Sequence, residues 1–145
     1  MLSQDFKEFV ELLNKNKVEY LIVGGYAVGI YGYPRYTGDL DVWIKPNLEN
    51  AEKMVTVMQD FGFASLRLTT EDFMTEGNVI QMGYPPFRID VLTRIDGVIF
   101  DHCYPNKKIV EYEDLKINFI GFDDLKNNKR ASGRSKDTDD LENLE

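Results

Sequence analysis

Apolar residues recur along the chain with two periods, and together they predict alternating helices and strands. Residues 3–16 place their apolar side chains on one broad helical face, with Ser3 as a candidate N-cap. Residues 20–23 form an uninterrupted apolar run, which is typical of a buried strand. Residues 47–61 predict a second amphipathic helix, and Gly62 ends it.

The remaining pattern predicts shorter elements. Apolar runs and alternation predict strands, and helical spacing after capping residues predicts helices. The further strands are expected at 39–44, 63–68, 79–82, 86–94, 108–112 and 115–120, the last two as a hairpin around Glu113-Asp114. The further helices are expected at 26–31, 69–74, 99–104 and 122–131, with a last one running to residue 145.

The most informative stretch begins where the first apolar run ends, at Gly24 and Gly25. Two glycines allow a tight turn and let the backbone lie close to a ligand. The helix predicted at 26–31 would turn its free N-terminal amides toward whatever binds there. Such helix starts attract phosphate through their N–H groups and the helix dipole.

Two aspartates, Asp39 and Asp41, open the next predicted strand. Residues two apart in a strand point to the same face, so both carboxylates lie together while the apolar residues between and after them face a core. Adjacent carboxylates repel each other unless a cation lies between them. Mg²⁺ takes one or two carboxylates together with substrate phosphates. A phosphate-binding turn beside this pair therefore indicates a nucleotide-handling site.

A third carboxylate, Asp90, lies inside the apolar strand expected at 86–94. An unpaired charge is rarely left in such a position. A neighbouring strand would place Asp90 beside the first two aspartates, and three carboxylates can hold two metal ions. The alternative is an ion pair with Arg88 or Arg94.

Two further groups could face phosphate. Arg35 and Thr37 share the face of the aspartates if the extended conformation begins early, and Arg35 is otherwise a surface arginine. The C-terminal part gathers several cations in an acidic chain: Lys126, Lys129, Arg130, Arg134 and Lys136. They form either a solvated helix end or a phosphate-facing edge, and charge alone favours the solvated helix end.

Length and composition limit the classes of protein. With 145 residues the chain predicts one domain, with a core at about 20–121 and a C-terminal helical segment at 122–145. The net charge of −8 disfavours non-specific binding to a nucleic-acid backbone. A single cysteine, Cys103, excludes an internal disulfide. Neither a signal peptide nor a membrane span is evident in the sequence, so we expect a cytoplasmic protein.

The ordered motifs resemble the nucleotidyltransferase superfamily related to DNA polymerase β, and in particular its small AbiEii-like toxin members. The resemblance covers about residues 20–141 and rests on the glycine pair, the Arg35-x-Thr37-x-Asp39-x-Asp41 run, Asp90 and a C-terminal motif. That last motif comprises Asp124-Leu125, Lys129, Ala131 and Lys136-Asp137, with Asp140-Leu141 beyond. The resemblance implies an α+β fold, a mixed β-sheet with helices packed on it.

The resemblance also implies a reaction, the transfer of a nucleoside monophosphate from an NTP to an acceptor hydroxyl with release of pyrophosphate. Asp39 and Asp41 would bind Mg²⁺, with two ions possible, and Asp90 would help to activate the acceptor. Gly24 and Gly25 would hold the triphosphate. Lys129 would face phosphate, and Asp137 would orient that lysine or the acceptor.

The sequence leaves the glycine turn, the acceptor and the biological role open. Many superfamily members carry Gly-Ser where this chain has Gly24-Gly25, so one hydroxyl contact to phosphate is lost. The acceptor could be a tRNA, a protein or a small alcohol, and a protein partner or a second copy could complete its pocket. The chain could be the toxin of a toxin–antitoxin pair. The competing hypothesis is an inactive nucleotide-binding or regulatory module.

Overall fold

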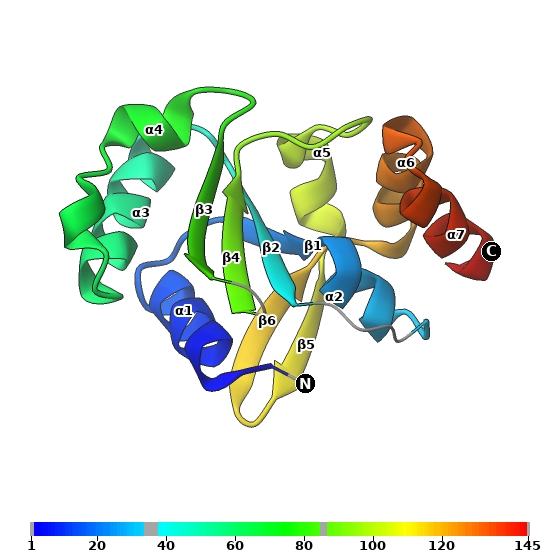
Figure 1. The fold of residues 1–145 in the computed structure, drawn as a ribbon, viewed down its shortest axis with the longest axis horizontal. Helices are drawn as coiled ribbons and strands as arrows, with labels where there is room; N and C mark the ends of the chain where they lie inside the picture. The colour runs from blue at the N-terminus through cyan, green and yellow to red at the C-terminus, as the bar shows by residue number, and fades with distance from the viewer. Residues whose placement is uncertain (1, 34–37, 85–86, 145) are drawn as a thin grey trace.

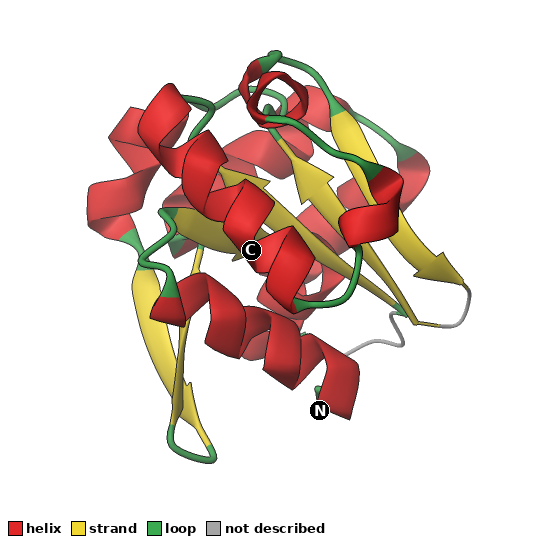
Figure 2. Cartoon of the chain, turned by 90° about the vertical axis from the view of Figure 1, so that its left-hand side faces the viewer, coloured by secondary structure: helices red, strands yellow, loops and turns green. Residues whose placement is uncertain are grey.

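The computed structural model describes residues 2–33, 38–84 and 87–144, and these form one mixed sheet with helices packed around it (Figures 1 and 2). The helices are α1 (Gln4–Lys15), α2 (Gly24–Ile30), α3 (Leu48–Asp60), α4 (Thr70–Met74), α5 (Phe100–Cys103), α6 (Phe122–Ser132) and α7 (Ser135–Leu144). The strands are β1 (Tyr20–Val23), β2 (Asp39–Ile44), β3 (Val79–Tyr84), β4 (Phe87–Leu92), β5 (Lys108–Tyr112) and β6 (Leu115–Phe119). This is the α+β class that the sequence predicts.

The six strands follow the order β3-β4-β2-β1-β6-β5. β1 runs antiparallel to β2 and parallel to β6, while β4 runs parallel to β2 and antiparallel to β3. β5 and β6 form the predicted hairpin. In Figure 1, α1, α3 and α4 lie to the left of the strands and α6 and α7 to the right. The neighbouring strands β4, β2 and β1 are therefore flanked by helices on both sides in this view.

The N-terminal helix forms as its sequence predicts. The Ser3 side chain accepts a hydrogen bond from the backbone N–H of Phe6 at 3.2 Å and so satisfies one free donor of the first turn. Phe6, Phe9, Val10 and Leu13 lie on one face and are buried in the core. Burying such an apolar face against the sheet is what stabilises a helix of this length.

A buried polar side chain fixes α3 to the sheet. Asn50 is 2% exposed, and its amide nitrogen donates to the backbone oxygens of Glu19 at 3.0 Å and Lys45 at 2.9 Å. Its side-chain oxygen accepts from the backbone N–H of Glu19 at 2.8 Å. Asn47 caps the same helix by accepting from the Asn50 N–H at 2.9 Å. These bonds hold the start of α3 at the end of β2.

One predicted strand is wrong. Residues 63–68 contain a 3-10 helix at Ala64–Leu66, followed by Arg67 in the left-handed conformation. Its three residues are exposed, so the segment has no buried face to pack as a strand. Phe63, whose apolar side chain suggested the strand, instead packs on Phe61 at a ring distance of 5.5 Å.

The other predicted elements form, with shifted ends. The helix after the first strand begins at Gly24 rather than at residue 26, and the strand expected at 79–82 extends to Tyr84. Within the described residues, none of the helices combines the length and the apolar character that a membrane crossing requires.

Candidate active site

The pairing of β2 with β4 brings the predicted carboxylates together. The parallel register sets Asp41 opposite Asp90 and Asp39 opposite Arg88. Asp39 and Asp41 share a face of β2 because they are two residues apart. The three carboxylates therefore lie in one small area of the sheet, as the spacing in the sequence predicts.

Arg88 lies between two of these carboxylates. Its Nε and Nη2 donate to the two oxygens of Asp90 at 2.9 and 3.1 Å, and Nη2 also donates to Asp39 at 2.9 Å. The paired guanidinium geometry is the strong, bidentate kind of ion pair. Sequence reasoning named Arg88 as one alternative partner of Asp90; the additional bond to Asp39 depends on the register of β2 against β4, which the sequence alone does not give.

Asp41 has a different environment. From the residues that the structure describes, no hydrogen bond or ion pair reaches its carboxylate. Burial and the neighbouring charges of Asp90 and Asp39 raise the pKa of Asp41 to about 6, against weaker opposing effects of Lys136 and Lys129. A partly buried carboxylate without a partner is a site prepared for a cation.

The glycine turn touches Asp41 directly. Gly24 has a φ of +70°, and a Cβ atom placed there would lie 2.1 Å from Oδ2 of Asp41. Only glycine accepts both the backbone conformation and this contact. Gly25 is buried at the start of α2. The missing Cβ of Gly24 therefore allows the backbone to approach the carboxylate.

A buried lysine on α6, Lys129, also belongs to this site. Lys129 is 3% exposed, and its Nζ lies 2.8 Å from Oδ1 of Asp137 and 3.2 Å from Oδ2 of Asp140. Ser132 and Arg134 each donate to Oδ2 of Asp137 at 2.6 Å. Burial acts to raise the pKa of Asp137, but the hydrogen bonds from Arg134, Lys129 and Ser132 outweigh it and hold that pKa well below its usual range. Asp137 is thus charged and fixes Lys129 in place.

Between these groups lies a hollow of about 360 Å³, which we call the carboxylate hollow. It is lined by Val23, Gly24, Asp41, Asp90, Leu92, Arg94, Ile95, Asp96, Asn128, Lys129, Ser132 and Arg134. Its walls therefore carry both carboxylates and cations, an arrangement suited to a ligand that binds metal and phosphate together.

The donor set suits Mg²⁺. Among residues 2–33, 38–84 and 87–144, no group of three or more His, Cys, Asp or Glu side chains forms a ready-made metal cage. Mg²⁺ does not require one, since it binds through one or two carboxylates, substrate phosphates and water. The guanidinium of Arg88 already occupies a cation position between Asp39 and Asp90, and Asp41 offers oxygen ligands beside it.

Most of the predicted site residues that the structure describes lie near one another. Gly24, Asp39, Asp41, Asp90 and Lys129 come together at the sheet. Gly25 does not line the hollow, and Asp137 is buried behind the lysine. Arg35 and Thr37 lie outside the described residues. Asp140 and Ser132 were not predicted as site residues; the i,i+3 spacing of Asp137 and Asp140 on one helical face is the signal that could have found the first of them.

The fold is that of solved nucleotidyltransferase-like proteins. A candidate nucleotidyltransferase of Thermotoga maritima matches 94% of this chain and 88% of its own, with 14% identity and a TM-score of 0.62. An antigenic nucleotidyltransferase-like protein of Paracoccidioides brasiliensis matches 99% of this chain and 77% of its own, with 16% identity and a TM-score of 0.61. The lincosamide antibiotic adenylyltransferase LnuA, solved with lincomycin bound, matches 99% of this chain and 96% of its own, with 15% identity and a TM-score of 0.56.

At these identities the likeness concerns the fold. No protein-family model matches the chain, and no curated protein sequence does.

Proposed function

We propose that this chain is a nucleotidyltransferase that moves a nucleoside monophosphate from an NTP to an acceptor hydroxyl and releases pyrophosphate. The observation that carries the proposal is the opposition of Asp41 and Asp90 in a hollow whose other walls are Gly24 and Lys129. A fold shared with the adenylyltransferase LnuA supports the same reaction class.

The phosphates have a place in this geometry. A phosphate oxygen can approach the backbone at Gly24, where a Cβ atom would be in the way. The ammonium of Lys129 has three donors, and Asp137 and Asp140 account for two of them. The third donor remains for a phosphate, and Arg134, which lines the same wall, adds a second cation.

Asp39, Asp41 and Asp90 are the residues that would hold Mg²⁺, as one ion or two. When bound, the metal neutralises phosphate charge and stabilises the attacking and leaving oxygens. Asp90 would accept the proton of the acceptor hydroxyl as that oxygen approaches the α-phosphorus. Phosphoryl transfer needs positioning and charge neutralisation more than covalent help, so this set of side chains is sufficient.

The direct test is transfer of label from [α-³²P]NTPs. The protein is incubated with each NTP, Mg²⁺ and a cell extract, which is then separated into RNA, protein and small-molecule fractions. We expect label in one fraction and pyrophosphate in solution, both lost in Asp41→Asn and kept in Asp60→Asn, an exposed control. Absence of label and pyrophosphate with every NTP would overturn the proposal.

Arg88 favours one alternative, an inactive nucleotide-binding or regulatory module. If its guanidinium is a permanent substitute for the metal, the protein binds NTP without Mg²⁺ and never turns it over. NTP binding that is indifferent to EDTA, together with no label transfer, would establish this alternative. The toxin role stays a prediction; growth arrest on expression of the wild type, but not of Asp41→Asn, tests it.

A further inference from the structure

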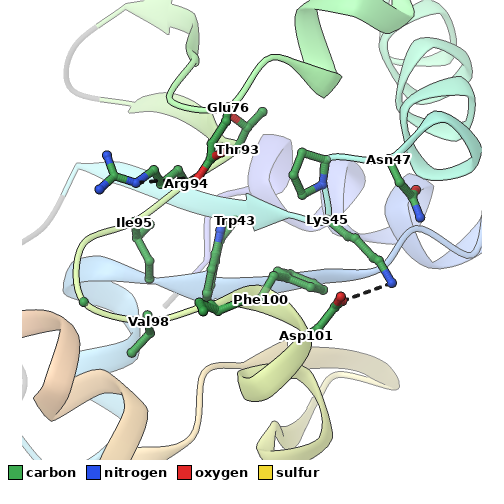
Figure 3. Close-up of a pocket in the computed structure, with 13 residues that line it drawn as sticks. Trp43, Lys45, Asn47, Glu76, Thr93, Arg94, Ile95, Val98, Phe100 and Asp101 are labelled. Carbon is green, nitrogen blue, oxygen red and sulfur yellow. Dashed lines mark ion pairs between the residues drawn. The ribbon is translucent and has the colours of Figure 1, made fainter.

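A second hollow, larger than the first, lies beside the end of β2. It has a volume of about 660 Å³, which is in the range of pockets for small organic ligands. We call it the tryptophan hollow, after Trp43 in its wall (Figure 3). It is lined by Trp43, Lys45, Pro46, Asn47, Glu76, Thr93, Arg94, Ile95, Gly97, Val98, Ile99, Phe100 and Asp101.

The tryptophan hollow borders the carboxylate hollow. Arg94 and Ile95 line both. Asp41 and Trp43 are two residues apart on β2 and therefore share a face, with a rise of about 7 Å between them. A small molecule seated against Trp43 can therefore reach the carboxylates with one of its own groups.

Gly24 and Trp43 lie on opposite sides of Asp41 along β2, and the carboxylate hollow extends from Gly24 to Leu92, which pairs with Trp43. In the antiparallel β1–β2 pair, Val23 is opposite Asp41 and Leu21 is opposite Trp43. Gly24 continues past Val23, away from Trp43. With the triphosphate held at Gly24 and the α-phosphorus near Asp41, the tryptophan hollow lies on the side of that phosphorus away from Gly24. In-line displacement requires the attacking oxygen to arrive opposite the leaving pyrophosphate, and the tryptophan hollow lies on that side.

The walls of the tryptophan hollow are apolar at the centre. Trp43 and Phe100 meet edge to face, with ring centroids 5.1 Å apart, and Ile95 and Val98 lie on the loop that faces them (Figure 3). Trp43 is 2% exposed, and its indole N–H has no hydrogen-bond partner among the described residues. The indole nitrogen is itself covered by protein atoms, so a ligand in this hollow meets the edge of the apolar wall and not the N–H.

The rim of this hollow carries both signs of charge. Lys45 pairs with Asp101 at 3.0 Å, and Arg94 lies 3.8 Å from Glu76. Two cations and two anions leave no net charge to attract a polyanion such as RNA. The lining suits an uncharged molecule with an apolar body and hydroxyl groups.

We propose that the tryptophan hollow binds the acceptor, and that the acceptor is a small uncharged alcohol with an apolar ring or alkyl body. This inference rests on the proposed function. The acceptor oxygen forms a bond to the α-phosphorus, and the bond from that phosphorus to the bridging oxygen breaks. Pyrophosphate leaves, and the hydroxyl proton passes to Asp90.

Trp43 is the only tryptophan of the chain, so its fluorescence reports on this hollow alone. The probe is 1-adamantanemethanol, an uncharged alcohol with an apolar cage that does not itself fluoresce. We expect a saturable change in Trp43 emission on titration. A titration without saturation would overturn the assignment.

A matched pair of variants locates the binding. Ile99→Arg places a long cation at the rim, and Ile109→Arg makes the same change on β5; the two isoleucines are 61% and 55% exposed, so neither change should affect folding. We expect Ile99→Arg to weaken probe binding at least about tenfold, with Ile109→Arg unchanged. Equal affinities in both variants would show that the probe binds elsewhere and would overturn the proposal.

A ternary titration separates the acceptor from the nucleobase. The probe is titrated again in the presence of Mg²⁺ and a saturating NTP analogue. The analogue carries a methylene group between the α- and β-phosphorus, so it cannot release pyrophosphate. Unchanged probe affinity supports the acceptor site. Competition would show that the hollow holds the base and would overturn it. If calorimetry detects no analogue binding by wild type while the probe still binds, the proposed function has failed, and the acceptor role fails with it.

Discussion

The fold disfavours the charged form of Asp41. Its pKa is raised to about 6 because the carboxylate is buried beside Asp90 and Asp39. At about pH 3 and below, the group is largely protonated whether the protein is folded or unfolded. As the pH rises toward 6 the unfolded chain ionises first, so the folded state loses roughly 2–3 kcal/mol of stability.

We therefore predict that Asp41→Asn is more stable than the wild type at pH 7.5 without metal, and that the difference vanishes near about pH 3. Urea unfolding at the two pH values measures it. Asp60→Asn, an exposed control, should match the wild type at both. A variant no more stable at pH 7.5 would contradict the description of Asp41 as a destabilising, functional carboxylate.

Arg88 is predicted to act as the resident cation of the site. Arg88→Gln leaves Asp39 and Asp90 without their shared guanidinium. We expect a lower Tm without metal and a larger rise in Tm on adding Mg²⁺ than in the wild type, because carboxylates left unpaired gain more from a cation. The exposed Arg67→Gln is the control. Equal responses to Mg²⁺ in both variants would exclude competition between arginine and metal.

Two constraints favour glycine at position 24, the positive φ and the close approach to Asp41, and a matched pair of variants separates them. Gly24→Ala and Gly62→Ala both place a Cβ at positive φ, +70° and +94°, but only at Gly24 does that atom meet another group, Asp41. We expect Gly24→Ala to cost at least about 1 kcal/mol more in urea unfolding than Gly62→Ala. Similar costs would show that the turn has no close contact with the carboxylate.

At the scale of elements, a buried ion pair joins α6 to α7. Lys129→Met leaves Asp137 and Asp140 buried without their shared lysine. Removing one member of a buried pair costs about 3–5 kcal/mol. Lys126→Met, on the same helix, breaks an exposed pair with Asp123 and a contact with the Phe122 ring, and should cost less than about 1 kcal/mol. Circular dichroism during urea unfolding compares the two.

The elements also show what the sequence could predict. Helical and strand periods located almost every element, because apolar positions there face a core in one consistent direction. Residues 63–68 failed because Phe63 packs on the neighbouring Phe61 while Ala64, Ser65 and Leu66 stay exposed. Charge alone favoured a solvated helix end for Lys129, whereas the family resemblance implied a phosphate-facing lysine oriented by Asp137. In the structure Lys129 is buried, and that burial depends on tertiary contacts with Asp137 and Asp140 on α7.

At the scale of the whole molecule, the candidate site depends on one register. Asp90 could be predicted as a site residue, since a lone carboxylate in an apolar strand needs a reason to be there. The second bond of Arg88 could not, because it follows from β4 lying beside β2 in that register. The burial of Trp43 on the same face as the aspartates could not be predicted either, since Phe100 covers it from a distant part of the chain.

The proposed activity requires that these carboxylates bind a metal–nucleotide complex. Isothermal titration of the four NTPs, with and without Mg²⁺, on wild type, Asp41→Asn and Asp60→Asn tests it most directly. We expect Mg²⁺-dependent binding of at least one NTP by wild type and Asp60→Asn, and its loss in Asp41→Asn. NTP binding that survives in Asp41→Asn, or no binding by the wild type, would contradict it.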